Sequence, residues 1–331
     1  MKVGQRTAAT DPGRKRRRNE DAYVCDPPLF AVADGMGGAQ AGEIASSLAA
    51  AALRERGDGD AGGEARVVEL IREANRRVHQ RALDDETASG MGTTITVALF
   101  QQEGTVAIGH VGDSRAYLLR DGSLEQLTED HSLVAELVRR GELSPEEAEV
   151  HPQRSVITRA LGTDPDVDVD AFSLRTQAGD LFLLCSDGLS TMVDGETIAA
   201  LLTRHRHDLR AAARALIKEA NDRGGDDNIT AVLFEVAEGD PDEETRERAT
   251  AGGDDEDTLH PEAEADAGPP PAPAHGHEGD TIVVPAGELR PSAGEPGDER
   301  RATPLQHLAA ALVTAALVAL IVVLVTRGLA R

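Results

Sequence analysis

The sequence predicts an α+β fold with layered antiparallel sheets, followed by a linker without regular structure and a C-terminal transmembrane helix. Two observations predict the layered fold. Short apolar runs typical of strands recur up to Val236, and the predicted helices come in pairs between groups of strands. Regular alternation of strands and helices would instead indicate a doubly wound parallel sheet. A third observation, the loss of apolar residues after Val236, predicts the linker.

The first predicted elements are two strands and two helices. Apolar runs at 23–25 and 29–33, separated by the turn Asp26-Pro27-Pro28, predict a pair of short strands. An alanine-rich segment at 41–56 and a second segment at 64–83 have apolar residues at helical spacing, so both are predicted to be helices.

The middle of the chain is predicted to be mostly strands. Apolar or β-branched runs predict them at 93–100, 105–111, 115–119 and 124–127. A helix is predicted at 131–140, and Ser144 followed by Pro145 marks the start of another. The polar segment 151–161 is less regular and is predicted to be a flap.

Aspartates alternate with other residues from Asp164 to Asp170. An EF-hand calcium loop starting at Asp164 would need Gly in place of Val169 and Glu in place of Arg175, so a half-exposed strand is the better interpretation. Later runs predict strands at 180–186 and 229–236, with helices at 195–204 and 208–222.

The chain therefore divides into a folded domain (5–237), a linker (238–304), a transmembrane helix (305–326) and a short tail (327–331). From Glu238 to Glu299 there are 19 acidic and 3 basic residues, and this Pro- and Gly-rich segment has too little apolar surface to fold. Two small islands, 257–259 and 280–284, could serve in docking or phosphorylation, but incidental linker sequence is the favoured interpretation.

The uncharged run 308–325 would be about 27 Å long as a helix, enough to span a bilayer. The chain opens with polar residues and no secretory signal, so we expect a single-pass protein of the cell membrane with its folded domain in the cytoplasm.

Charge and cysteine content exclude other classes of protein. The net charge of −25 disfavours nucleic acid as a partner, although residues 14–18 form one basic cluster. Cys25 and Cys185 lie far apart in the sequence, which disfavours a disulfide framework or a thiolate zinc site and fits a reducing compartment.

Acidic residues follow or precede several of the predicted strands, at positions 20–21, 34, 113, 187 and 226–227. Each alone is most simply a cap or turn residue, and the glycine-rich stretch after Asp34 is by itself an ordinary turn. Strands of a sandwich can bring their ends to one edge, however, where several carboxylates repel one another unless cations neutralise them. Oxygen ligands without Cys or His indicate Mg²⁺ or Mn²⁺.

Six short motifs occur in a fixed order. They are Arg-x-x-Asn-Glu-Asp (16–21), Ala-Asp-Gly-Met-Gly-Gly (33–38), Gly-Thr-Thr (92–94), Gly-Asp-Ser-Arg (112–115), Ser-Asp-Gly (186–188) and Asp-Asn-Ile-Thr (227–230). Together they resemble the metal-dependent protein serine/threonine phosphatases of type 2C, most closely the membrane-anchored actinobacterial members that oppose eukaryotic-like Ser/Thr kinases. The resemblance covers residues 7–236, and the ordered set is far more specific than any single motif.

The resemblance implies an αββα sandwich with a two-metal centre at one edge of the sheets. It implies these metal-site residues: Asp34 bridging the two ions, Gly35 through its carbonyl, Asp187 and Asp227 on the second ion, Glu20 and Asp21 through metal-bound waters, and Asp113 on a third, weaker ion. Asp227 is preferred to its neighbour Asp226 because the aspartate of the family stands directly before Asn.

The resemblance also implies that Arg16 binds the substrate phosphate, since a planar guanidinium suits two phosphate oxygens. Arg16 and Asp34 would be the catalytic residues, with a metal-activated water attacking phosphorus. Many eukaryotic members have a proposed general acid, His, where this chain has Met36. Solvent, a flap residue such as His151 and a metal-bound water are the alternatives.

The leading hypothesis is a membrane-tethered, Mn²⁺- or Mg²⁺-dependent phosphatase with a monomeric catalytic domain. Its partners would be phosphorylated proteins, including Ser/Thr kinases and their substrates. A catalytically silent scaffold that binds phosphoproteins is one alternative, but none of the matched carboxylates is missing. A small-molecule phosphatase is another, and the lack of a predicted second, substrate-specific domain gives it little support.

Overall fold

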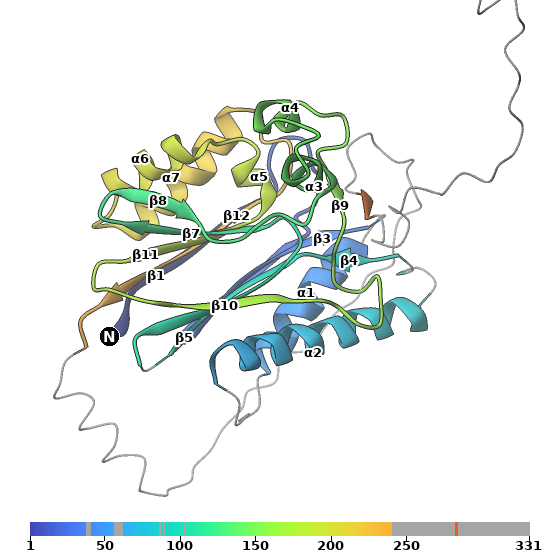
Figure 1. Cartoon of the computed structure of the whole chain (residues 1–331), viewed down its shortest axis with the longest axis horizontal. Coiled ribbons are helices and arrows are strands. Elements are labelled where there is room, and N and C mark those ends of the chain that lie inside the picture. Colours follow the sequence, from blue (N-terminus) through green and yellow to red (C-terminus); the bar gives the residue numbers. More distant parts are fainter. Residues whose placement is uncertain are drawn as a thin grey trace, which may run out of the picture. The chain divides into compact units, whose positions relative to one another are not determined.

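A computed structural model describes residues 1–37, 41–55, 62–85, 88, 90–101, 103–239 and 282–283. Two antiparallel sheets lie face to face, and pairs of helices cover their outer faces (Figure 1). The predicted α+β class with layered antiparallel sheets is confirmed.

The first sheet has the strand order β1–β12–β11–β7–β8. Its strands are β1 (Lys2–Asp11), β12 (Ile229–Ala237), β11 (Leu181–Cys185), β7 (Arg115–Arg120) and β8 (Ser123–Gln126). The strand β1 was not predicted, because it lies at the sheet edge and none of its residues is fully buried. Its pairing with β12 along most of its length identifies it.

The second sheet has the order β10–β6–β5–β3–β2, and the short β4 also pairs with β3. Its strands are β10 (Asp170–Arg175), β6 (Thr105–Val111), β5 (Ile95–Gln101), β3 (Leu29–Met36), β2 (Asp21–Asp26) and β4 (Gly92–Thr93). The predicted strand 93–100 is divided at Thr94. There the Thr94 amide donates to the carbonyl of Asp34, and the Thr94 hydroxyl accepts from the Asp34 amide.

The prediction of a strand at 164–170 is wrong, because β10 begins only at Asp170. The preceding segment is held by a side chain instead. Asn75 donates from its amide nitrogen to the carbonyls of Asp164 and Pro165, at 3.0 and 3.1 Å. Those carbonyls therefore bond to a helix side chain and not to a neighbouring strand.

The core of the sandwich lies between the two sheets. In β11, Phe182 and Leu184 face the other sheet, whereas Leu183 faces the helices on the outside. Burial on both faces explains why this strand is a continuous apolar run. Phe234 of β12 stacks between Phe30 and Phe182, with ring centroids 4.1 and 4.8 Å away.

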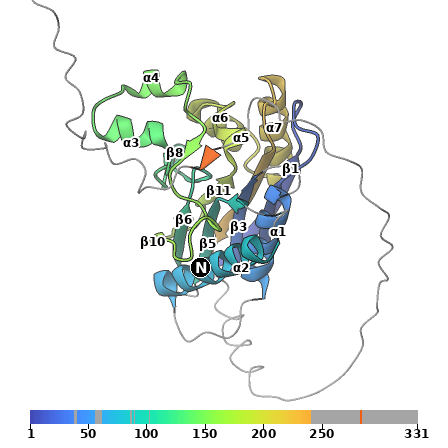
Figure 2. The same ribbon diagram turned by 90° about the vertical axis from the view of Figure 1, so that its right-hand side faces the viewer.

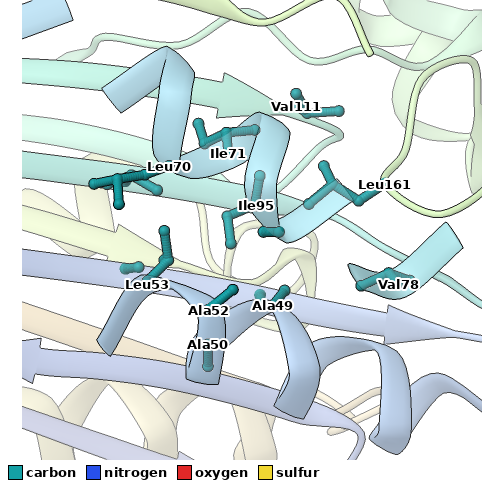
Figure 3. Packing of buried hydrophobic residues seen from close by; sticks show 14 of the residues in the cluster. Ala49, Ala50, Ala52, Leu53, Leu70, Ile71, Val78, Ile95, Val111 and Leu161 are labelled. Carbon is teal, nitrogen blue, oxygen red and sulfur yellow. The ribbon is translucent and has the colours of Figure 1, made fainter. Parts of the chain in front are cut away.

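Helices complete the two outer layers. On the second sheet lie α1 (Ala41–Arg54) and α2 (Gly63–Asp84); on the first lie α6 (Gly195–Arg204) and α7 (Leu209–Asp222). Figure 3 shows Ala49, Ala52 and Leu53 of α1 in one apolar cluster with Ile71 of α2 and Ile95 of β5. The small alanines let α1 approach β3 closely, which matters for the site at the end of β3.

A segment that we call the flap (residues 132–161) contains α3 (Leu133–Arg139), α4 (Pro145–Glu149) and β9 (Val156–Ile157). Its helices lie apart from the sheets in Figure 2. As predicted, Ser144 caps α4, in a reciprocal capping box with Glu147. The flap is larger than the predicted 151–161.

Most of the predicted linker and the whole predicted transmembrane helix lie outside the described residues. Ile282–Val283 is described, however, and forms the strand β13, which pairs in parallel with β9. Irregular structure is therefore the wrong prediction at these two residues. Among the described residues, no helix combines the length and apolar character needed to cross a bilayer.

Candidate metal centre

Strand register brings two of the predicted site residues together. Asp21 and Asp34 are direct partners across β2 and β3, at the open end of this hairpin. Side chains of opposed residues start about 5 Å apart at their Cβ atoms. The adjacent Gly35 amide donates to the carbonyl of Glu20 (3.1 Å), which continues the contact beyond the paired residues.

The first sheet brings three more aspartates together at the ends of its strands β7, β11 and β12. Cys185, the last residue of β11, pairs with Ala231 near the start of β12 and with Arg115 at the start of β7. Asp187 follows β11 at the start of the short helix α5 (Asp187–Ser190), while Asp227 precedes β12 and Asp113 precedes β7.

All of the predicted site residues except Asp21 line one of two spaces. A small cavity is bordered by Arg16, Glu20, Asp34, Gly35, Met36, Gly37 and Asp227. A cleft of about 850 Å³ is lined by Asp113 and Asp187 together with residues of the flap. Asp21 lies beside both, since the Ser186 hydroxyl next to Asp187 donates to its Oδ2 (2.8 Å). Asp227, rather than Asp226, lines the small cavity.

Burial and mutual repulsion hold these carboxyl groups away from their ionised state. Burial raises the pKa of Asp34 well above its usual range, and the charges of Asp21 and Asp187 raise it further. Burial raises the pKa of Asp21 to about 7 and that of Asp187 to about 6, with repulsion from neighbouring aspartates adding to both. The pKa of Asp113 is also raised well above its usual range, by burial and by the charge of Asp187. This edge therefore favours the uptake of protons or cations.

The donor set fits a divalent cation that prefers oxygen ligands. Asp21 Oδ1 and Asp187 Oδ1 are buried and have no hydrogen-bond partner among the described residues. The charge of Asp187 acts on the Asp34 carboxyl and raises its pKa, so the two carboxylates belong to one cluster. No three acidic, His or Cys side chains in the described part of the chain are already close enough together to hold one ion. Two of the carboxylates instead accept hydrogen bonds from other side chains, Asp21 from Ser186 and Asp227 from Arg16.

Arg16 is the member of the basic cluster that enters the site. Its Nη2 donates to Asp227 Oδ2 at 2.9 Å, and its side chain is about one quarter exposed. Two other members of the cluster pair with acidic residues that are not predicted site residues: Lys15 pairs with Asp226 (2.7 Å), and Arg18 lies 3.7 Å from Glu43. A guanidinium at the mouth of an acidic cavity can bind an anion that enters it.

Asn228 organises the loop that carries Arg16 and was given no role from the sequence. Its Oδ1 accepts from the Glu20 amide (2.8 Å), and its Nδ2 donates to the carbonyls of Pro12 and Arg18 at 3.0 and 2.8 Å. The Asp-Asn-Ile-Thr motif contained this residue, but its long-range partners were not visible in the sequence.

His131 holds the loop before Asp113 and was also missed. The Gly112 amide donates to its Nδ1 (3.0 Å), while its Nε2 lies 3.1 Å from Asp170 Oδ2. Burial lowers the pKa of His131, and burial lowers the pKa of His110 to about 3; the two rings are tilted, with centroids 4.7 Å apart. Both imidazoles are therefore neutral near pH 7 and have a structural role.

Two other side chains that could act in catalysis, His151 and Cys185, do not line the site. His151 is not part of the described lining of either space, and its Nδ1 accepts from the Gln153 amide. Cys185 is fully buried, and burial raises its thiol pKa to about 12. A thiol in that state is a poor nucleophile.

The fold and the carboxylate cluster at its edge define a class of protein. Residues 14–233 match the family described as protein phosphatase 2C. The chain belongs to this family.

Its relatives are bacterial serine/threonine phosphatases. It is 41% identical over 256 residues to the serine/threonine protein phosphatase PstP of Mycobacterium tuberculosis, covering 76% of this chain and 49% of PstP. It is 42% identical over 242 residues to the serine/threonine phosphatase stp of Listeria monocytogenes, covering 68% and 93%. The chain spans about half the length of PstP.

Solved structures agree with the fold. The crystal structure of the PstP phosphatase of M. tuberculosis superposes with a TM-score of 0.67 at 41% identity, over 71% of this chain and all of that one. The PstP catalytic domain in complex with two manganese ions gives a TM-score of 0.65 at 39% identity, over 71% and 99% of the two chains.

Proposed function

We propose that this protein hydrolyses phosphoserine and phosphothreonine in proteins, using Mn²⁺ or Mg²⁺. The observation that carries the proposal is the pair of buried, unpartnered oxygens of Asp21 and Asp187 beside Asp34, next to a cavity with Arg16 at its mouth. Burying several carboxylates without a cation is costly, and a phosphate needs a cationic group to bind. The printed names of its bacterial relatives support the same activity.

Each acidic residue has a proposed role at this edge. Asp34 would be the ligand shared by two ions, and Gly35 would offer its carbonyl to one of them. Asp187 and Asp227 would hold the second ion, Glu20 and Asp21 would act through water, and Asp113 would help to hold a third, weaker ion. The all-oxygen donor set supports this assignment.

Two divalent cations at this edge would supply hydroxide at neutral pH and neutralise charge on the phosphate. The residues of the chain position the reactants. Arg16 leaves Asp227 to bind two phosphate oxygens, and this fixes the orientation of phosphorus toward the carboxylate edge. Residues of the flap line the cleft, where they would contact the peptide that carries the phosphate.

No imidazole in the described lining of either space could donate the proton to the leaving alcohol. Met36 lines the small cavity beside Asp34 and Gly35. His151 is therefore less favoured than solvent, because the leaving oxygen would face the solvent-filled cleft. A water held at the carboxylate edge remains the other source.

Hydrolysis of a phosphothreonine peptide by the full chain is expected to require added Mn²⁺ and to stop when EDTA is added. Phosphate release measures the reaction, and restoring Mn²⁺ after EDTA is the control for irreversible damage. Full activity in EDTA would contradict the proposed chemistry. Tight phosphopeptide binding without hydrolysis at any Mn²⁺ concentration would favour the scaffold.

We also propose that residues 305–326 anchor the protein in the cell membrane, with the phosphatase domain in the cytoplasm. There it would reverse phosphorylation by Ser/Thr kinases. The uncharged run 308–325 supports this proposal. Deleting all residues after Thr303 is expected to move the protein from the membrane pellet to the supernatant. The control is the full chain washed with high salt, which should stay in the pellet. A truncated chain that still pellets with membranes would contradict the anchor.

A further inference from the structure

A short strand from the acidic linker lies on the flap. Ile282 pairs with Val156 and Val283 with Ile157, in parallel, and β13 is the orange arrow beside β9 in Figure 1. We propose that this edge of β9 is a docking surface for the chain's own segment around Ile282–Val283, and that the docked strand steadies the flap.

The β9 strand is a junction between the flap and the metal site. On its other side, Ile157 forms a bridge with Ser132, and the Thr158 amide donates to the carbonyl of His131 (2.8 Å). The side chain of Ile157 is only 2% exposed and belongs to the same apolar cluster as Met36. Ile157 therefore connects the two regions: its backbone pairs with Val283 of β13, and its side chain packs in one cluster with Met36, two residues after Asp34.

The sequence of the docking segment suits a strand. Thr281, Ile282, Val283 and Val284 are four consecutive β-branched residues, and Pro285 follows them. β-Branched residues favour extended backbone, and a proline ends the pairing. The surrounding linker is acidic and poor in apolar residues, so this island is the part of it best suited to pair with an edge strand.

The covalent connection between β13 and the folded domain allows even a weak contact between β13 and β9 to form. About 40 residues separate Gly239 from Ile282 in the sequence. By polymer statistics, a random-coil polypeptide of that length has an average end-to-end distance of roughly 35 Å. Such a tether keeps the segment at an effective concentration near the millimolar range. A two-residue strand would not bind from solution, but it can bind within the same chain.

Docking of β13 on the flap is expected to affect the cleft, because the flap supplies part of its lining. Flap residues including Val134, Val138 and Arg154 line the same cleft as Asp113 and Asp187. If the chain is the phosphatase proposed above, docking orders this wall before a phosphopeptide binds and lowers the entropy that binding must remove. None of the proposed metal ligands lies on β9 or β13, so we expect these ligands to stay in place without the docked strand.

Hydrogen exchange in the full chain tests the docking directly. The double variant Ile282→Pro/Val283→Pro removes both amide donors of β13 and fixes their backbone. Exchange of the amides at 154–158 is expected to become about three- to tenfold faster in this variant. The matched control is Leu259→Pro, in the other linker island, which should leave these amides unchanged. Equal exchange in wild type and double variant would overturn the proposal. So would protection that disappears on dilution, because a second copy would then be the occupant.

Kinetics give a second readout, which rests on the proposed function. The double variant is expected to raise the KM for a phosphothreonine peptide about threefold and to leave kcat for a small aryl phosphate unchanged. An unchanged peptide KM would overturn the ordering of the cleft wall. If the wild type hydrolyses neither substrate, the proposed function fails, while the exchange experiment still decides the docking.

Discussion

Replacing Asp34 with asparagine is expected to lower kcat for a phosphothreonine peptide about 10³-fold or more at saturating Mn²⁺. Asp34 is the carboxylate that faces both Asp21 across the β2–β3 pair and Asp187 from the other sheet. The role proposed for Asp34 is to bridge two cations, and a neutral amide in its place would be a poor ligand for them. Phosphate release measures the loss, and Asp166→Asn, at an exposed aspartate, is the matched control.

The same Asp34→Asn change is expected to stabilise the metal-free protein at pH 8, by several degrees in melting temperature. The folded-state pKa values of Asp21 and Asp187 are raised to about 7 and about 6, so the folded chain binds more protons than the unfolded chain between about pH 4 and 7. Stability therefore falls as pH rises through this window. Removing one charge should relieve the repulsion at pH 8 and matter less at pH 5. If Asp34→Asn melted below wild type at pH 8 in EDTA, this account of charge repulsion would be contradicted. If Asp34→Asn hydrolysed the phosphothreonine peptide as fast as wild type, the proposed catalytic role of Asp34 would be contradicted.

Replacing Gly35 with alanine is expected to destabilise the protein by about 3 kcal/mol or more and to abolish activity. A Cβ on Gly35 would lie 2.1 Å from the carbonyl oxygen of Gly42 and 2.6 Å from that of Glu20. Both obstacles are backbone atoms, so a side-chain rotation cannot remove the overlap. The strand end or the start of α1 must move, and Asp34 moves with it.

Urea denaturation monitored by circular dichroism measures this loss of stability. Gly195→Ala is the matched control, because a Cβ at this first residue of α6 meets nothing within 4 Å. It should leave stability unchanged or raise it slightly, since alanine favours helix more than glycine. If Gly35→Ala denatured at the same urea concentration as wild type, the close contact between β3 and α1 would not be required.

Prediction from the sequence succeeded where burial leaves a local pattern. The runs that became β3 and β11 are apolar because both faces of these strands are covered, and this is visible within a few residues. Helix α4 was marked by its own capping residues. By contrast, β1 has no buried residue, and the aspartate alternation before Asp170 imitates a strand although Asn75 holds that segment as a loop.

By itself, the sequence determined which carboxylates stand at strand ends, in which order, and that oxygen ligands dominate among them. Those properties depend on neighbouring residues along the chain. Only the tertiary structure decided that Asp21 faces Asp34, that Arg16 reaches Asp227, that Asn228 ties the loop 12–20 to β12 and that linker residues pair with β9. Each of these contacts joins segments through strand register or a long-range hydrogen bond. Register and long-range hydrogen bonds are set by the packing of the whole domain, and no local sequence pattern specifies them.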